Sequence, residues 1–148
     1  MSRELSYEKV DDGYLIRMYP GQEILSSLIE FAKEKNIVSA MIAGIGGVNK
    51  IEIGFFNLTI KEYNRKVFEE DLELVSLLGN LSYVNGEPFI HAHGTFGNAQ
   101  YQGIAGHCFS LMISVTAEIH LIEFSKKIER RLDATMRVNL LDLSSKRK

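Results

Sequence analysis

Short apolar runs separated by turn-forming residues make up most of the chain, and this pattern predicts a protein built mainly of β-strands. The runs that we expect to be strands cover residues 38–45, 48–56, 66–70, 72–78, 82–84, 89–95 and 103–124. Gly46-Gly47 is interpreted as a break between the first two runs. The pairs Gly79-Asn80, Asn85-Gly86 and Gly97-Asn98 fall between later runs, where successive hairpins need turns. We therefore expect a mostly antiparallel sheet.

The N-terminal end carries two further patterns. Residues 5–10 and 14–19 flank Asp11-Asp12-Gly13, and aspartate and glycine permit the positive φ angles of a tight turn, so we expect a hairpin. Between residues 22 and 35, apolar residues recur with the spacing of one helical face and charged residues fill the opposite face. This predicts an amphipathic helix. Asn36 is suited to end it, because asparagine tolerates the left-handed conformation at helix C-termini.

Size and composition are those of one compact domain. The chain has 148 residues, of which 45% are hydrophobic, and no repeat or Pro-rich linker interrupts it. Residues 126–131 are compatible with a helical turn or two, and 136–143 alternate too weakly to separate strand from irregular structure. We expect a single domain over residues 1–148 with an α+β fold: one sheet or small barrel with the amphipathic helix packed on it.

Charge and hydropathy exclude several classes of protein. Seventeen basic and nineteen acidic side chains give a net charge of −2, so no global positive field attracts nucleic acid or anionic lipid. The basic cluster Lys146-Arg147-Lys148 is the exception. No stretch approaches the roughly 20 apolar residues of a membrane helix. The N-terminal residues lack the apolar segment of a secretory signal, and the single Cys108 cannot form an intramolecular disulfide, so we expect a cytoplasmic protein.

Three of the four histidines fall within seventeen residues, and this cluster is the strongest chemical signal in the chain. Side chains alternate along a strand, so His91 and His93 point to the same face and Ala92 to the other. A turn after residue 97 would bring the segment 103–107 back beside them, with His107 as a third imidazole. Three imidazoles can hold Zn²⁺ and leave a fourth position open for chemistry. Packing roles for these histidines remain the alternative.

Other residues with chemical potential are weaker candidates. Glu118 lies opposite the expected core face of its strand, which comprises Val115, Ala117, Ile119 and Leu121. It is either a general acid or base, a metal ligand or second-layer group, or a solvated carboxylate. His120 is interpreted as an exposed or hydrogen-bonded histidine, and Cys108 as a core residue. Residues 44–47 are rich in glycine but lack the spacing of a phosphate-binding loop.

Several segments in one order resemble the plant- and prokaryote-conserved (PPC) domain family. They are Gly44-Ile45-Gly46-Gly47-Val48, residues 72–81, His91-Ala92-His93, residues 103–107, and Thr116-Ala117-Glu118-Ile119. With the first hairpin and helix, the resemblance covers a core of about 5–124 and leaves 125–148 as a C-terminal extension. It implies an antiparallel, barrel-like sheet, a homotrimer, and distant structural kinship with acetolactate decarboxylase, whose metal is held by three histidines. Ala105 departs from the family's usual Gly-Gly-His.

By this resemblance, the metal-binding histidines of acetolactate decarboxylase correspond to His91, His93 and His107 here. Zinc is the first choice of divalent metal. We expect a metal-binding protein that, if it is an enzyme, is a metal-dependent lyase or hydrolase acting on a small oxygen-rich molecule, with Glu118 as acid or base. The alternative is a non-catalytic regulatory module that binds DNA or protein as a trimer. The AT-hook segments of the plant proteins are absent, so we do not expect strong DNA binding by this chain.

Overall fold

The computed structural model describes residues 4–143, so the basic cluster at residues 146–148 lies outside the described residues. Its elements are β1 (Ser6–Val10), β2 (Gly13–Met18), α1 (Ile24–Lys35), β3 (Ala40–Asn57), β4 (Glu62–Phe68), β5 (Leu72–Val84), β6 (Glu87–Gly97), β7 (Gly103–Glu123), β8 (Glu129–Leu132) and β9 (Asn139–Asp142). The described part of the chain is therefore mostly β-structure with a single helix.

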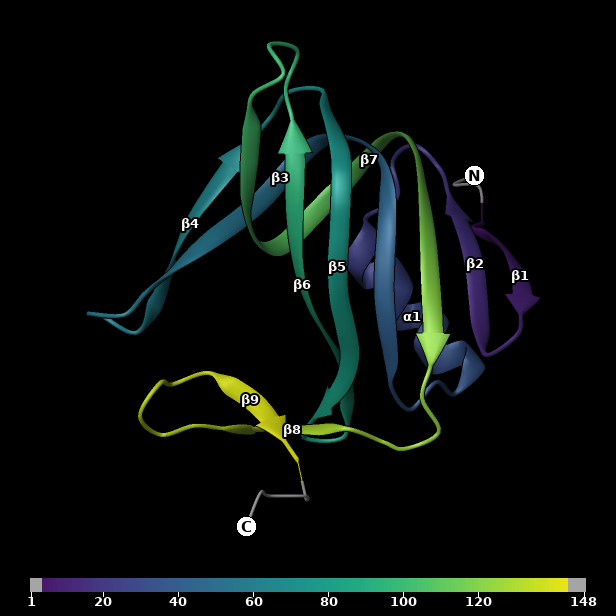
Figure 1. Ribbon diagram of the computed structural model, residues 1–148, viewed down its shortest axis with the longest axis vertical. Coiled ribbons are helices and arrows are strands. Elements are labelled where there is room, and N and C mark those ends of the chain that lie inside the picture. The colour runs from purple at the N-terminus through teal and green to yellow at the C-terminus, as the bar shows by residue number, and fades with distance from the viewer. Residues whose placement is uncertain (1–3, 144–148) are drawn as a thin grey trace.

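Four long strands form the centre of the sheet. β3 pairs with β5 and β7, and β6 also pairs with β5 and β7, so the hydrogen-bonded pairs close into a ring. The β1–β2 hairpin extends the sheet along β7, and β4 extends it along β3 (Figure 1). All pairs of named strands are antiparallel except one contact between Tyr83 and Glu129, so the mostly antiparallel arrangement is confirmed.

The helix packs against one face of this sheet, on the side opposite to the viewer in Figure 1. Its buried residues are Ile24, Leu25, Leu28, Phe31 and Ala32, the apolar face that the sequence pattern indicated. They join a core from the inward faces of the long strands. Asn36 ends the helix with φ 56°, in the left-handed conformation expected. No helix among the described residues has the length and apolarity that crossing a bilayer requires.

Two predicted strand breaks are wrong. Gly46-Gly47 lies inside β3, which runs without interruption past a shift in register near this pair. Gly79-Asn80 lies inside β5, where Gly79 pairs with Ala92. A Cβ atom on Gly79 would lie 2.3 Å from the carbonyl oxygen of His91, so the glycine permits close approach of two strands. The Asn85-Gly86 turn is confirmed, with φ angles of 50° and 85°.

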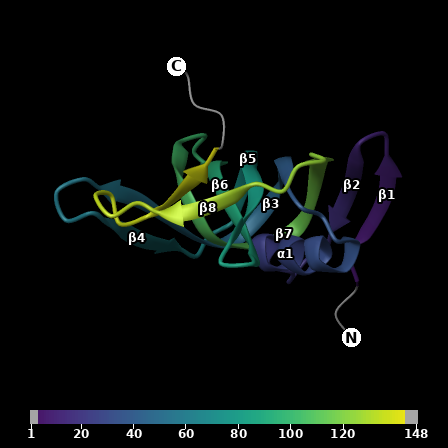
Figure 2. The ribbon, with the colours of Figure 1, turned by 90° about the horizontal axis from the view of Figure 1, so that it is seen from below.

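The C-terminal extension forms a hairpin of β8 and β9 that crosses beneath the ends of the long strands (Figures 1 and 2). The helical turn expected over 126–131 is therefore wrong, because none of these residues is helical and 129–131 belong to β8. Arg130 is buried while Glu129 and Arg131 are exposed, which is the alternation of a strand. Residues 136–143, left open by the sequence, supply β9. This hairpin brings the extension close to the histidine cluster.

Candidate metal centre

The three clustered histidines meet where β6 and β7 pair. His91 and His93 lie on one face of β6, and Ala92 between them is buried in the core, as the alternation predicted. His93 stands directly opposite His107 in the register of the two strands. The predicted return of the chain is thus confirmed, and the sheet itself fixes the three imidazoles side by side.

The loop between β6 and β7 sets this register. Gly97 pairs with Gly103, and the five residues between them form a compact turn. The side chain of Asn98 closes it, because its Oδ1 atom accepts hydrogen bonds from the backbone N–H groups of Gln100 and Gln102 at 3.0 and 2.9 Å. A loop held in this way prevents a slip of one residue, which would turn His107 to the opposite face.

The geometry of the three imidazoles fits a small metal ion. One nitrogen from each of His91, His93 and His107 lies within 4.8 Å of the other two. The Nε2 atoms of His91 and His93 are 3.2 Å apart. Two nitrogens bound to one tetrahedral Zn²⁺ at 2.0–2.1 Å would be separated by about 3.3 Å. The pair is therefore already near the required separation, and His107 is close enough to complete the set.

Electrostatics keep two of the imidazoles neutral, which is the form that binds metal. Burial, and then the charges of Arg130 and His93, lower the pKa of His91. The pKa of His107 falls to about 4, first through burial and then through His91, His93, Arg65 and Arg130. Arginine side chains thus favour the neutral form of these two imidazoles.

Aromatic side chains hold His107 in place. Its ring packs against Tyr63 on β4 and Phe109 on β7, with ring centroids 4.6 and 4.7 Å away. The Tyr63 hydroxyl lies 3.5 Å from Nδ1 of His107, at the outer limit of a hydrogen bond. This leaves Nε2 of His107 for a metal. Burial raises the pKa of Tyr63, so its hydroxyl keeps its proton.

Arg130, from β8, lies on the other side of the cluster and is only 6% exposed. Its guanidinium donates to Ser82 Oγ at 2.8 Å, to the Asn139 carbonyl at 3.0 Å and to Asn80 Oδ1 at 2.9 Å. Its Nη2 atom also lies 3.4 Å from Nδ1 of His91. Arg130 therefore connects the C-terminal hairpin to β5 and to the histidine cluster.

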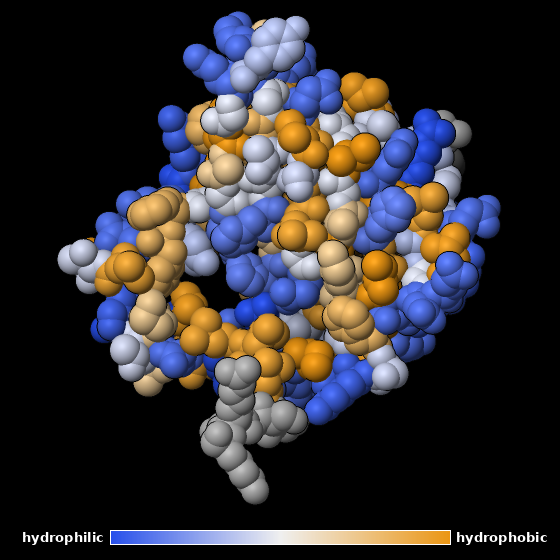
Figure 3. Space-filling view, in the orientation of Figure 1, coloured by the Kyte–Doolittle hydropathy of each residue, from blue (hydrophilic) through white to orange (hydrophobic). Residues whose placement is uncertain are grey.

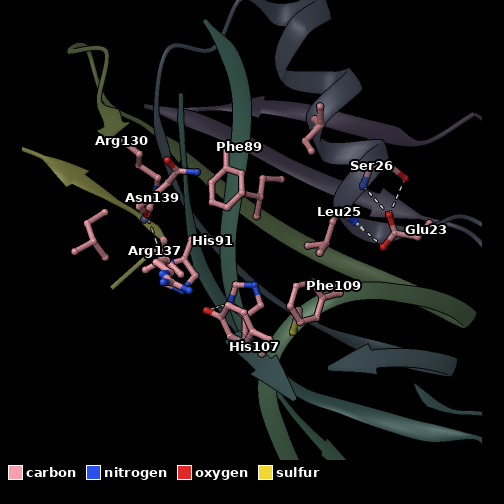
Figure 4. Close-up of a pocket in the computed structure, with 16 residues that line it drawn as sticks. Glu23, Leu25, Ser26, Phe89, His91, His107, Phe109, Arg130, Arg137 and Asn139 are labelled. Atoms are coloured by element: carbon pink, nitrogen blue, oxygen red, sulfur yellow. Dashed lines mark hydrogen bonds between the residues drawn. The ribbon is translucent and has the colours of Figure 1, made fainter. Parts of the chain in front are cut away.

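A pocket of about 520 Å³ opens beside His91 and His107, in the size range of small-molecule sites. Figure 4 shows Arg130, Arg137, Asn139 and His91 on one side and Glu23 with Ser26 on the other. Apolar side chains from α1, β6, β7 and the C-terminal hairpin complete the wall: Leu25, Ile29, Phe89, Ile90, Phe109, Val138 and Leu140. A ligand in this pocket would meet the imidazoles at one end and apolar side chains along its length.

The other sequence candidates lie elsewhere. Glu118 is exposed, pairs with Ile45 and Arg17 across the sheet, and lines separate depressions. Within one chain it does not join the three histidines, and its acid–base role stays a prediction. His120 is exposed on β7, outside the cluster. Cys108 is buried and burial raises its pKa to about 12, which fits the core role expected.

Sequence reasoning missed Tyr63 and Arg130, because each reaches the site through a pairing that no local pattern reveals. Tyr63 arrives through the β3–β4 pair, in a segment whose start was expected at residue 66. Arg130 stands in a run of charged residues in which nothing distinguishes it from Arg131. The one sequence signal for Arg130 is that an apolar residue lies on each side of the charged run, a pattern compatible with a short strand.

Solved structures of similar proteins cover nearly the whole chain. A candidate DNA-binding protein from Bacteroides thetaiotaomicron is 33% identical, with a TM-score of 0.91 over 95% of this chain and 98% of that chain. A plant- and prokaryote-conserved (PPC) protein from Pyrococcus horikoshii is 34% identical, with a TM-score of 0.84 over 95% and 96%. A metal-containing protein from Archaeoglobus fulgidus is 31% identical, with a TM-score of 0.83 over 95% and 99%.

Acetolactate decarboxylase from Bacillus subtilis subspecies spizizenii is a more distant neighbour. It is 15% identical, with a TM-score of 0.51 over 81% of this chain and 54% of that chain, a likeness of fold alone. No curated protein matches the chain. The family model of the Plants and Prokaryotes Conserved (PCC) domain matches residues 5–125, close to the core expected from the sequence. The chain therefore belongs to the PCC domain family, as its ordered motifs predicted.

Proposed function

We propose that this protein binds one divalent metal ion per chain through His91, His93 and His107, with zinc as the first choice. The observation that carries the proposal is the convergence of three imidazole nitrogens within 4.8 Å at the edge of a pocket. Imidazole also suits iron, nickel and copper. The similar protein from Archaeoglobus fulgidus is named as metal-containing, which supports the same reading.

The pocket supports a reaction on a small oxygen-rich molecule, of the metal-dependent lyase or hydrolase class. A zinc ion held by three imidazoles supplies a Lewis acid with one position open to water or a substrate oxygen. Apolar side chains line much of the pocket beside that position. Tyr63 holds a proton next to His107, and Arg130 supplies fixed positive charge next to His91. Tyr63 thus offers a protonated hydroxyl beside the imidazoles, whereas Glu118 lies outside the pocket.

Metal analysis tests the proposed function directly. Protein purified without chelator and without a metal-affinity step is expected to contain about one equivalent of metal per chain by elemental analysis. If it is isolated empty, reconstitution with Zn²⁺, Mn²⁺, Fe²⁺, Ni²⁺ or Cu²⁺ followed by desalting should restore that ratio. Near-zero metal after reconstitution with every one of these ions would reduce the three histidines to packing residues.

The second candidate function is a non-catalytic DNA-binding module, favoured by the name of the similar Bacteroides protein. Charge argues against strong binding by this chain alone. A net charge of −2 per chain gives −6 for three chains, so counterion release has little to act on. We expect no sub-micromolar affinity for duplex DNA at about 150 mM salt in fluorescence anisotropy. Tight binding that survives deletion of residues 146–148 would promote the DNA-binding function instead.

We also propose that the protein assembles as a homotrimer. Three exposed apolar side chains, Ile45, Val75 and Val115, come together from β3, β5 and β7 around one depression. Val115 was expected in the core, but it lies where the register of β3 and β7 shifts and is 69% exposed. Association of identical chains would bury an exposed apolar sheet face of this kind. The number three comes from the family resemblance.

Light scattering coupled to size-exclusion chromatography at micromolar concentration is expected to give three times the chain mass of 16.7 kDa. Val115→Glu should lower that mass, because it buries a charge in the proposed interface. Val10→Glu, on the outer strand β1, is the matched control and should leave the trimer intact. A clean monomer for the unaltered protein would contradict the proposal.

A further inference from the structure

Arg130 differs from Arg65 and Arg131 in having no acidic partner among the described residues. Arg65 and Arg131 are exposed, and each pairs with a carboxylate, Glu52 at 2.8 Å and Asp142 at 2.7 Å. Arg130 is almost fully buried, and within residues 4–143 no carboxylate pairs with it. The most buried guanidinium of the site therefore has no carboxylate as a counter-charge within the described residues.

A buried charge is costly unless an opposite charge or a full set of hydrogen bonds compensates it. A guanidinium has five N–H donors, and three of those of Arg130 reach Ser82, Asn139 and Asn80. All three acceptors are neutral. Two further N–H groups remain, one on Nη1 and one on Nη2, and Nη2 lies 3.4 Å from Nδ1 of His91.

Metal binding would add one more hydrogen-bond donor without an acceptor next to Arg130. Nε2 of His91 faces Nε2 of His93, so when Nε2 holds the metal the proton of the neutral ring sits on Nδ1. Nδ1 then lies 3.4 Å from Nη2 of Arg130, and both atoms are donors. A metal-bound imidazole ordinarily donates its second N–H to an acceptor. Tyr63 is placed to accept from His107, whereas His91 faces a cation.

The space in front of these donors is open to a ligand. Arg137 lines the same side of the pocket, next to His91 and Asn139 in Figure 4, and forms no ion pair within the described part of the chain. Figure 3 shows the surface hollowed above the β8–β9 hairpin, with hydrophilic residues around the hollow and apolar residues along its lower rim. Two guanidinium groups thus stand at one end of a pocket whose wall is otherwise mostly apolar.

We propose that Arg130, Arg137 and the Nδ1–H group of His91 form an oxyanion site that binds the carboxylate or phosphate group of a small ligand. Guanidinium groups suit both anions, because their planar arrays of N–H donors match paired oxygens. The proposal deepens the proposed function and rests on it for the metal-dependent part, in which an oxygen of the same ligand reaches the histidines. The ligand class is a small organic acid or phosphate with a short apolar body.

Isothermal titration calorimetry with malonate, inorganic phosphate and the neutral malonamide tests the site. We expect malonate or phosphate to bind zinc-loaded protein and malonamide to give no heat of binding. Binding by malonate alone identifies a carboxylate site, and binding by phosphate alone a phosphate site. Chelator-treated protein should bind the same anion several-fold more weakly, because Nδ1 of His91 can then accept from Arg130. A measurable affinity in both states shows that Arg130 holds the anion without the metal.

Substitutions separate recognition from support of the fold. Arg130→Met should weaken anion binding by roughly 10- to 100-fold, the loss of hydrogen bonds between charged groups. Arg130→Lys keeps the charge and loses the planar fork, so it should recover only part of the affinity. Arg137→Met, at an exposed position, should weaken binding without affecting the fold. Arg131→Met is the matched control, since Arg131 is next in the chain and faces solvent.

The outcomes distinguish this inference from the proposed function. Metal at one equivalent per chain with no binding of either anion overturns the oxyanion site and leaves the metal site standing. Anion binding that depends on Arg130 or Arg137 in protein that takes up no metal supports the oxyanion site and overturns the metal proposal. If Arg130→Met does not fold, Arg130→Lys and Arg137→Met decide, and unchanged affinity in both contradicts the inference.

Discussion

Protein carrying His93→Ala is expected to lose nearly all of its bound metal and to keep its fold. Two imidazoles and solvent hold Zn²⁺ far more weakly than three imidazoles do, so metal should not survive desalting. His93 is exposed, so its removal leaves no cavity in the core. The large apolar core does not depend on an ion, in contrast to a zinc finger. Elemental analysis and circular dichroism measured on the same sample check both parts.

His120→Ala is the matched control for this experiment. It removes a second exposed histidine from β7, outside the cluster, and should leave the metal content of the protein unchanged. Equal loss of metal in both variants would mean that the metal sits elsewhere or binds without specificity. Loss of circular dichroism signal in His93→Ala would show instead that the ion supports the fold.

The histidine cluster could be predicted from sequence because each step of the inference is local. The alternation of side chains along a strand puts His91 and His93 on one face, and a short loop rich in turn residues returns His107 beside them. The helix was equally local, since its apolar face and its Asn36 end need no tertiary information. Elements whose determinants lie within about fifteen residues were thus open to sequence reasoning.

The surroundings of the cluster depend on contacts between distant segments and were not predictable in the same way. Tyr63 and Arg130 reach it from β4 and β8, which lie 44 residues before His107 and 39 residues after His91. Glu118 is the opposite case. Its position in the sequence was compatible with a role at the site, but β7 bends and carries Glu118 to another part of the surface (Figure 1). Gly46-Gly47 and Gly79-Asn80 were misread as strand breaks, because close strand approach and turns both favour glycine.

Glu23 links the start of α1 to β7, and we expect its removal to have a large effect on stability. It precedes α1 as its N-cap, and its carboxylate accepts from the backbone N–H groups of Leu25 at 3.1 Å and Ser26 at 2.7 Å. The Ser26 hydroxyl donates to it as well. On the sheet side, its Oε1 atom accepts from the backbone N–H of Leu111 in β7 at 2.8 Å. One side chain thus caps the helix and attaches it to the strand that carries His107.

Glu23→Ala is expected to destabilise the protein by about 3 kcal/mol. Loss of a helix N-cap costs about 1 kcal/mol, and an unpaired, partly buried N–H at Leu111 adds roughly 1–3 kcal/mol. In a domain of this size, Tm should fall by about 10 °C in thermal unfolding followed by circular dichroism. Glu30→Ala is the matched control on the same helix, because Glu30 is exposed and its contact with Lys33 spans 3.7 Å. That exposed pair contributes little, so Tm should hardly change. Equal Tm values for the two variants would show that Glu23 neither caps the helix nor attaches it to the sheet in solution.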